Sequence, residues 1–223
     1  MTVELQSKLP HLGTTIFTEM SALAQQHGAV NVSQGFPDIS PPEGLVEAAI
    51  KALHDGVHQY APMAGRPDLR AWICGHHAER HGATYDPATE CTIGAGASSL
   101  LFAAITAFVQ PGDEVVVQTP AYDLYAPAVA LAGGQLVEVP LLGEDGAWNL
   151  DALLGAIHDR TRLVILNTPH NPTGTVCPRG FLDELANHLD GKSTLVLSDE
   201  VYGPIVHDGR AEVSLAAHPV LRE

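Results

Sequence analysis

Four short apolar runs alternate with helical segments in the second half of the chain, and this alternation constrains the fold more than any other feature. The runs are EVVVQTP, QLVEVPL, RLVILNTP and TLVLSDEVY, at residues 114–120, 135–141, 162–169 and 194–202. Helical segments separate them, near residues 122–132, 150–159 and 179–190. Apolar strands that alternate with helices predict an α/β fold, with a mostly parallel sheet and helices on both faces. Ligands of such sheets bind at the carboxyl ends of the strands.

The first half of the chain reads as helical after an irregular start. Residues 1–40 look irregular apart from a helical stretch near Thr18–Gln26. Amphipathic or apolar patterns predict three more helices, at residues 44–56, 68–82 and 99–109. Gly56 and Gly82 close the first two. The third is so apolar that we expect it to be a buried helix rather than a surface one.

Composition excludes several classes of function. The chain has 223 residues, 11 of them Lys or Arg and 26 Asp or Glu, which gives a formal charge of −15. Nucleic acids and anionic membranes bind clustered basic residues, so neither is an expected partner. The longest apolar run, residues 100–109, falls short of the roughly 20 residues that span a bilayer. The N-terminus lacks the basic and apolar regions of a secretory signal.

Cysteines and histidines point away from disulfides and metals. The chain has three cysteines, Cys74, Cys91 and Cys177, none of them in a CxxC pair. This odd count is typical of a protein from the reducing cytoplasm. Histidines are spaced i, i+4 at His77 and His81, but HHAERH lacks the glutamate of an HExxH site. Solvated helix faces therefore explain these histidines better than a metal site.

Two segments at strand or helix ends could contact a ligand in the first part of the predicted domain. The stretch IGAGASSL, residues 93–100, runs from a short β-like segment through glycines into the apolar helix. A glycine-rich helix N-terminus binds anions, although Ser98 could also be an ordinary N-cap. Tyr122 follows a strand and a proline, where its ring could stack on a flat ligand or simply pack.

Two further segments follow the later strands. In LNTPHNPTGTVCP, residues 166–178, prolines flank Asn171, which is either an amide donor to a ligand or part of a plain Asn-Pro turn. Asp199 ends an apolar strand, where a carboxylate is costly unless it meets a cation or a strong donor. Tyr202 lies three residues later. An anion cradle, a stacking ring, an amide, a carboxylate and a phenol together suit a phosphorylated heterocycle with a basic ring nitrogen, such as pyridoxal phosphate.

The same segments resemble a known family. HNPTG, SDEVY and AYDLYAP, at these separations, resemble the class I and II aminotransferases of pyridoxal-phosphate fold type I. The stretches at 12–38 and 58–70 resemble the methionine and kynurenine–glutamine aminotransferases. The resemblance covers essentially the whole chain, which looks like only the N-terminal part of such an enzyme. It implies an N-terminal arm with a small-domain segment at 1–40 and an incomplete cofactor-binding large domain at 41–223, without the C-terminal small domain.

The resemblance assigns contacts with the cofactor to five residues. Ala97 and Ser98 are implied to bind its phosphate, and Tyr122 to stack on its pyridine ring. Asn171 and Tyr202 are implied to hydrogen-bond the phenolic oxygen of pyridoxal phosphate.

Four more residues receive roles in the same way. Asp199 is implied to pair with the pyridine N–H and keep that nitrogen protonated. Tyr60 resembles the residue that reaches the phosphate held by a neighbouring subunit, which implies a homodimer. Gly35 resembles the glycine beside the substrate carboxylate, and Phe17 an apolar wall of the substrate pocket.

One part of the family pattern has no counterpart. The family uses a lysine as a covalent anchor and a base, but Lys8, Lys51 and Lys192 are the only lysines here, and none matches its context. We therefore expect an aminotransferase that transfers the amino group of a neutral or aromatic, methionine-like amino acid to a 2-oxo acid, with this chain inactive alone. A C–S β-lyase of the same fold, or a non-catalytic fragment that binds pyridoxal phosphate or dimerises, stays open. A nucleotide-dependent oxidoreductase is disfavoured because GxGxxG is missing.

Overall fold

A computed structural model of the protein describes residues 6–35, 37–144, 146–207 and 209–222. The chain forms two compact units, residues 1–62 and 63–223. The first contains α1 (Ile16–His27) and α2 (Glu43–His54). The side chain of Thr15 accepts a hydrogen bond from the backbone N–H of Thr18 at the start of α1, and Gly28 ends that helix in the left-handed conformation. Neither helix contains a buried residue.

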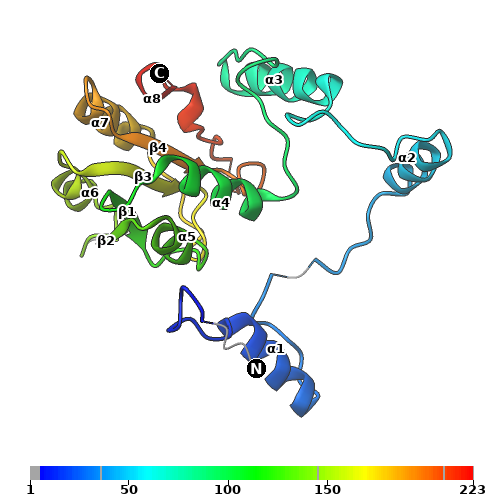
Figure 1. Ribbon diagram of the computed structural model, residues 1–223, viewed down its shortest axis with the longest axis horizontal. Coiled ribbons are helices and arrows are strands. Elements are labelled where there is room, and N and C mark those ends of the chain that lie inside the picture. The colour runs from blue at the N-terminus through cyan, green and yellow to red at the C-terminus, as the bar shows by residue number, and fades with distance from the viewer. Residues whose placement is uncertain (1–5, 36, 145, 208, 223) are drawn as a thin grey trace. The chain divides into compact units, whose positions relative to one another are not determined.

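The second unit is built on a parallel sheet of four strands (Figure 1). The strands are β1 (Glu114–Thr119), β2 (Gln135–Pro140), β3 (Thr161–Asn167) and β4 (Leu195–Asp199). Their order is β2-β1-β3-β4, and every neighbouring pair is parallel. Valine, isoleucine and leucine dominate these strands because both faces of the sheet are covered. The predicted α/β class and parallel sheet are therefore confirmed.

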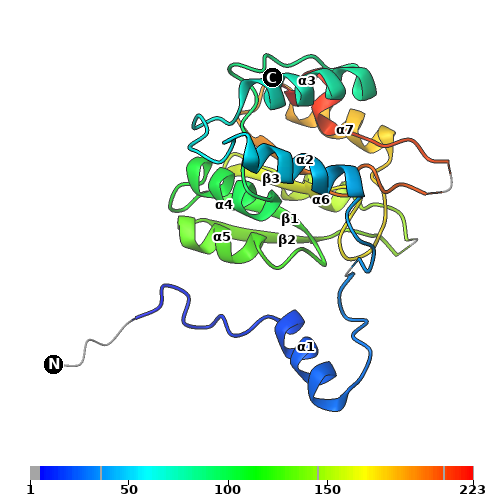
Figure 2. The same cartoon turned by 90° about the vertical axis from the view of Figure 1, so that its right-hand side faces the viewer.

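Two pairs of helices cover the two faces of the sheet (Figures 1 and 2). Side chains of β3 alternate between them: Leu163 and Ile165 pack in a cluster with α4 and α5, whereas Val164 and Leu166 pack in a cluster with α6 and α7. The helices are α4 (Ala97–Phe108), α5 (Tyr125–Ala132), α6 (Leu150–Ala156) and α7 (Arg179–Leu189). The prediction that helices cover both faces is confirmed.

The remaining elements of this unit are helical and lie at its two chain ends. They are α3 (Pro67–His81), a 3₁₀ turn at Leu215–Ala217 and α8 (Pro219–Arg222). The loop after α3 is tied to the end of the chain, because the Tyr85 hydroxyl donates to the carbonyl of Ala216 at 2.7 Å. The Arg222 guanidinium adds a bond to the carbonyl of Thr84 at 3.3 Å.

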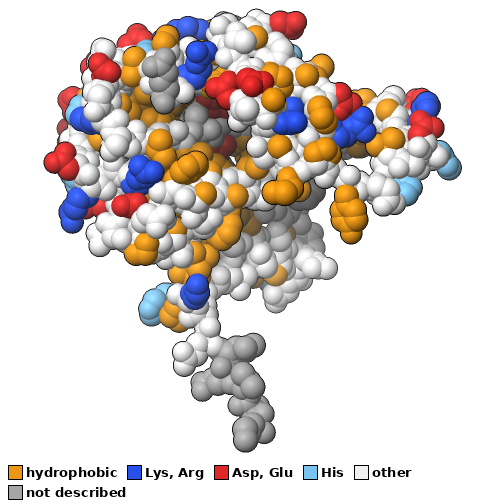
Figure 3. All heavy atoms as spheres, turned by 45° about the horizontal axis from the view of Figure 1, so that its top comes forward, with side chains coloured by type: hydrophobic (Ala, Val, Ile, Leu, Met, Phe, Trp, Pro, Cys, Tyr) orange, Lys and Arg blue, Asp and Glu red, His pale blue; other side chains and the backbone are white. Residues whose placement is uncertain are grey.

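Three expectations about this unit were wrong. The apolar helix α4 is not buried all round: it buries Leu101 and Ile105 against the sheet, while Phe102 and Phe108 are 39% and 48% exposed. Such exposed apolar side chains are visible on the surface in Figure 3. The short β-like segment that leads into Gly94, residues 91–93, forms no strand, because no strand among the described residues pairs with it. Residues 200–202 leave β4 as a turn rather than extending it.

Candidate functional site

A pocket of about 180 Å³ lies at the carboxyl ends of the strands. The strands that follow β1 in the chain, β2 and β3, lie on opposite sides of it in the sheet. Ligands of such sheets usually bind where the strand order reverses in this way, at the carboxyl ends of the strands. The structure brings together six residues that the sequence singled out, from four separate segments. With three neighbours they line the pocket: Ala97, Ser98, Leu101, Tyr122, Asn167, Asn171, Asp199, Val201 and Tyr202.

The N-terminus of α4 forms one wall of this pocket. Its N-cap is Gly96, with φ of 84°, and no side chain caps the helix. The first N–H groups of a helix have no partner within it, so those of Ala97 and Ser98 are available to an anion. Because Ser98 lies inside the helix, the alternative that it is an ordinary N-cap is wrong. Its hydroxyl lies 3.1 Å from the hydroxyl of Tyr122.

The turn after β3 is held in place by a side chain that the sequence analysis missed. The Asn167 amide group donates to the carbonyl of Asp199 at 2.9 Å, and its carbonyl oxygen accepts the backbone N–H of Asn171 at 2.6 Å. Asn167 is buried, so these bonds are shielded from water. It thereby links the ends of β3 and β4 and fixes the backbone at Asn171.

Two side chains of the pocket have donors without protein partners. Within the described ranges, the amide group of Asn171 and the hydroxyl of Tyr202 make no hydrogen bond to another residue. Tyr202 is 40% exposed, and Asn171 is half-buried. Both can therefore donate to a ligand without breaking an existing bond.

Asp199 is the charged group of the pocket. It is 8% exposed, and its two oxygens accept from neutral donors: Oδ2 from the Tyr125 hydroxyl at 2.7 Å and Oδ1 from the backbone N–H of Val201 at 3.3 Å. No ion pair with Asp199 occurs among the residues that the structure describes. Burial raises the pKa of Tyr125, and its bond to Asp199 raises that pKa further. The carboxylate thus offers its charge to a cationic group of a ligand.

Tyr125 is the second residue that sequence reasoning missed. It is 2% exposed, stands at the start of α5, and its ring meets that of Tyr122 edge-on at 5.7 Å. A tyrosine three positions after another at a helix start carries a weak signal, since both rings then lie on one side. Only the packing of α5 shows that its hydroxyl reaches β4.

Three predicted site residues belong to the other unit. Phe17 is half-buried in α1, whereas Gly35 and Tyr60 are exposed. The structure describes each unit by itself, so the roles of these residues stay predictions.

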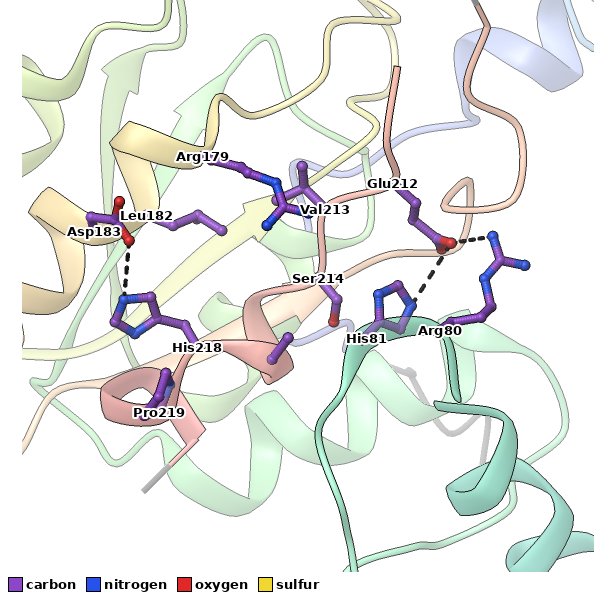
Figure 4. Close-up of a pocket in the computed structure, with 11 residues that line it drawn as sticks. Arg80, His81, Arg179, Leu182, Asp183, Glu212, Val213, Ser214, His218 and Pro219 are labelled. Atoms are coloured by element: carbon purple, nitrogen blue, oxygen red, sulfur yellow. Dashed lines mark hydrogen bonds and ion pairs between the residues drawn. The ribbon is translucent and has the colours of Figure 1, made fainter. Parts of the chain in front are cut away.

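A larger hollow of about 270 Å³ lies between α3, α7 and the end of the chain (Figure 4). Most of its charged side chains pair with one another, and Arg179 is the exception among the described residues that line it. Glu212 lies between Arg80, with which it forms an ion pair, and His81, whose Nε2 is 3.8 Å away. His218 Nε2 lies 3.3 Å from a carboxylate oxygen of Asp183. These pairs join α3, α7 and the end of the chain, and therefore have a structural role in the unit.

Neither a metal cluster nor a spanning helix stands out in the part of the chain that the structure describes. No group of three or more His, Cys, Asp or Glu side chains there could hold a metal ion. No helix in the same ranges is long and apolar enough to cross a membrane.

Comparison with known proteins bears on the same residues. The family model for aminotransferase class I and II matches residues 28–221. The methionine aminotransferase of Escherichia coli (strain K12) is 46% identical over 218 residues, which are 98% of this chain and 56% of that protein. Kynurenine–oxoglutarate transaminase 1 of Rattus norvegicus is 35% identical over 233 residues, covering 98% of this chain and 55% of its own length.

Solved structures share the fold. A crystal structure from Escherichia coli, described as having a methionine aminotransferase function, superposes with a TM-score of 0.94 at 45% identity. That match covers 100% of this chain and 58% of the solved one. The chain thus spans slightly more than half the length of the relatives it matches.

Proposed function

The chain belongs to the class I and II aminotransferases, and from this we propose that it supplies the cofactor pocket of an enzyme that transfers amino groups. Enzymes of this family depend on pyridoxal phosphate. The donor we propose is a neutral or aromatic amino acid, with methionine as the first candidate, and the acceptor is a 2-oxo acid. The observation that carries the proposal is the convergence of six predicted residues on one pocket.

The chemistry of the pocket fits the cofactor. An uncapped helix N-terminus at Ala97 suits a phosphate, and a half-buried ring at Tyr122 suits a flat heterocycle. In the part of the chain that the structure describes, the hydrogen-bond partners of Asp199 are neutral, which suits a protonated ring nitrogen. The free donors of Asn171 and Tyr202 suit an anionic oxygen.

Each residue then has a physical task. When bound, pyridoxal phosphate supplies a ring that withdraws electrons from the substrate. The N–H groups of Ala97 and Ser98 hold the phosphate with the positive end of α4. Asp199 keeps a proton at the ring nitrogen, and the donors of Asn171 and Tyr202 stabilise negative charge at the phenolic oxygen.

The wider arrangement belongs to the same proposal. Residues 41–223 form most of the cofactor domain and residues 1–40 an arm that brings Phe17 and Gly35 to the substrate. Tyr60 contacts the phosphate held by a second subunit, so the working form is a homodimer, and we place it in the cytoplasm. A methionine donor is supported by the similarity to the methionine aminotransferase of Escherichia coli.

The lysines define what the chain does alone. Lys192 precedes β4, at the opposite end of that strand from Asp199, and is exposed. By resemblance, neither Lys8 nor Lys51 matches the family's lysine either. We therefore propose that this chain binds pyridoxal phosphate without a covalent bond and needs a lysine from elsewhere to transfer amino groups.

The test titrates the purified chain with pyridoxal phosphate and follows its absorbance, then reduces the mixture with borohydride and measures the intact mass. We expect saturable binding and no pyridoxyl adduct. Absence of binding would refute the cofactor pocket, and an adduct on Lys192 would contradict the non-covalent mode. For a longer polypeptide that includes the lysine, amino transfer from methionine supports the function, whereas release of pyruvate or 2-oxo acid with a thiol identifies a C–S lyase.

A further inference from the structure

We propose that Tyr125 is a positioning residue that helps to keep the proton on the ring nitrogen of the cofactor through its hydrogen bond to Asp199. This inference rests on the proposed function, because it concerns the same pocket. It goes further in assigning a role to a residue that does not line the pocket and that received no role from the resemblance, although it lies in the AYDLYAP segment.

The contact is short, buried and directed. The Tyr125 hydroxyl donates to Asp199 Oδ2 at 2.7 Å, and the two residues are 2% and 8% exposed. The tyrosine stands at the start of α5, where the helix packs on the sheet through Ala128 and Val129. Its ring is fixed on one side by the edge-on contact with Tyr122. The phenol therefore cannot turn away from the carboxylate without disturbing the core.

The protein surroundings of Asp199 explain why this one donor matters. Among the described residues, the one other hydrogen bond to the carboxylate comes from the Val201 N–H and is long, at 3.3 Å. The other titratable groups that act on this pair among the described residues are the phenols of Tyr122 and Tyr202. Tyr125 itself stays protonated, because burial and its partner both raise its pKa.

The proton between Asp199 and a pyridine nitrogen has two possible positions. Hydrogen bonds to a carboxylate stabilise its charged form, so they favour a proton on the nitrogen. Without the phenol, the buried carboxylate has one weak donor left, and the proton shifts toward the carboxyl group. Tyr125 thus acts on the cofactor through Asp199 and touches neither cofactor nor substrate.

The experiment compares the unaltered chain with Tyr125→Phe, which keeps the ring and removes the hydroxyl. Dissociation constants for pyridoxal phosphate come from absorbance titrations, and ¹⁵N NMR of cofactor labelled at the ring nitrogen reports where the proton is. We expect Tyr125→Phe to weaken binding about tenfold, the size expected of a hydrogen bond to a charged group. We also expect the ¹⁵N signal to move toward that of neutral pyridine.

Tyr85→Phe is the matched control, since the hydroxyl of Tyr85 also donates a 2.7 Å bond, to the carbonyl of Ala216. It should leave both readouts unchanged. In the Asp199→Asn background, Tyr125→Phe should have no further effect on the ¹⁵N signal. An unchanged signal in Tyr125→Phe, or an equal shift in Tyr85→Phe, would overturn the inference.

A measurement without cofactor separates this inference from the proposed function. If the unaltered chain binds no pyridoxal phosphate, the proposed function fails. The carboxyl ¹³C signal of Asp199, assigned by its loss in Asp199→Asn, can still be titrated. Tyr125→Phe should raise the pKa of that carboxyl, and an unchanged pKa would show that the phenol does not control its proton affinity. Should Tyr125→Phe unfold, the unaltered chain still supplies a test, because a carboxyl group of Asp199 that titrates no lower than an ordinary aspartate would refute the role.

Discussion

Two buried carboxylates stand at opposite ends of the parallel sheet, and their partners differ. Glu114 begins β1 and is 4% exposed; its Oε1 lies 2.5 Å from the Arg160 guanidinium, and its Oε2 lies 2.9 Å from His158 Nε2, without hydrogen-bond geometry. Asp199 ends β4 and is 8% exposed, but within the described ranges its carboxylate accepts hydrogen bonds only from a phenol and a backbone N–H.

The difference separates a structural carboxylate from one reserved for a ligand. A buried charge is costly unless an opposite charge or strong donors compensate it. At Glu114 the protein supplies the cation itself. At Asp199 two neutral donors hydrogen-bond the carboxylate but do not offset its charge, so a ligand can supply the cation.

The largest effect should come from removing the negative charge of Asp199, and it should appear as weaker binding of pyridoxal phosphate. Asp199→Asn keeps the shape of the side chain but cannot form an ion pair with a protonated ring nitrogen. We expect the dissociation constant for pyridoxal phosphate to rise by about 10- to 100-fold, the range for a charge-assisted hydrogen bond. The same exchange at the other end of the sheet, Glu114→Gln, should leave that constant unchanged. Equal losses in both variants would remove the distinction between the two carboxylates.

The next effect concerns the ion pair between Glu114 and Arg160 and its contribution to the stability of the protein. Arg160→Met leaves Glu114 buried with His158 as its remaining partner. Because the Arg160 side chain is 70% exposed, we expect a loss of about 1–2 kcal/mol in the free energy of unfolding, less than for a fully buried pair. Adding Glu114→Gln to this variant should recover most of the loss. Urea denaturation measures both, and a double variant no more stable than Arg160→Met would contradict the pairing.

Gln118 is a further buried polar side chain of the sheet, and it differs from both carboxylates because its amide group lacks a hydrogen-bond partner among the described residues. Gln118 in β1 is 3% exposed, and neither atom of its amide group has a hydrogen-bond partner among the described residues. Gln118→Met removes the unsatisfied groups at similar volume, so we expect the protein to gain about 1 kcal/mol in urea denaturation. The control is Gln135→Met, because Gln135 is exposed in β2. It should change the unfolding free energy little. A loss of stability at position 118 would mean that its amide is satisfied in solution.

The strands and the residues that end them were predictable, because both depend on local pattern. A run of Leu, Val and Ile at 163–166 has no stable place except a buried strand, and the polar residues after such a strand must meet a ligand or one another. That reasoning found Asn171 and Asp199, which the structure places in one pocket. The family resemblance added which part of a cofactor each would contact.

The contacts that complete the pocket were not predictable, because they depend on tertiary packing. Tyr125 reaches a carboxylate 74 positions away only through the seating of α5 on the sheet. The side chain of Asn167 binds the backbone N–H of Asn171 in its own turn, but it reaches the carbonyl of Asp199 only because β3 and β4 are adjacent in the sheet. Helix α4 is apolar around its circumference, so its periodicity could not show which side the sheet covers.

The smallest effect is a change in the pH dependence of stability, and it concerns His170. This residue lies in the turn beside the pocket, and the prediction tests whether its buried imidazole stays neutral. It is 5% exposed, its Nδ1 lies 2.9 Å from the Thr173 hydroxyl, and burial lowers its pKa. A histidine with a lowered pKa in the folded state binds fewer protons there than in the unfolded chain as pH falls below about 6.5. Its contribution to stability is therefore fully present above that pH and is lost on acidification. His170→Gln cannot titrate, so its unfolding free energy should fall less between pH 7.5 and 5.5 than that of the unaltered chain. Equal losses in the two proteins would show that His170 is protonated as easily in the folded state as in the unfolded one, which would contradict the lowering of its pKa by burial in this turn.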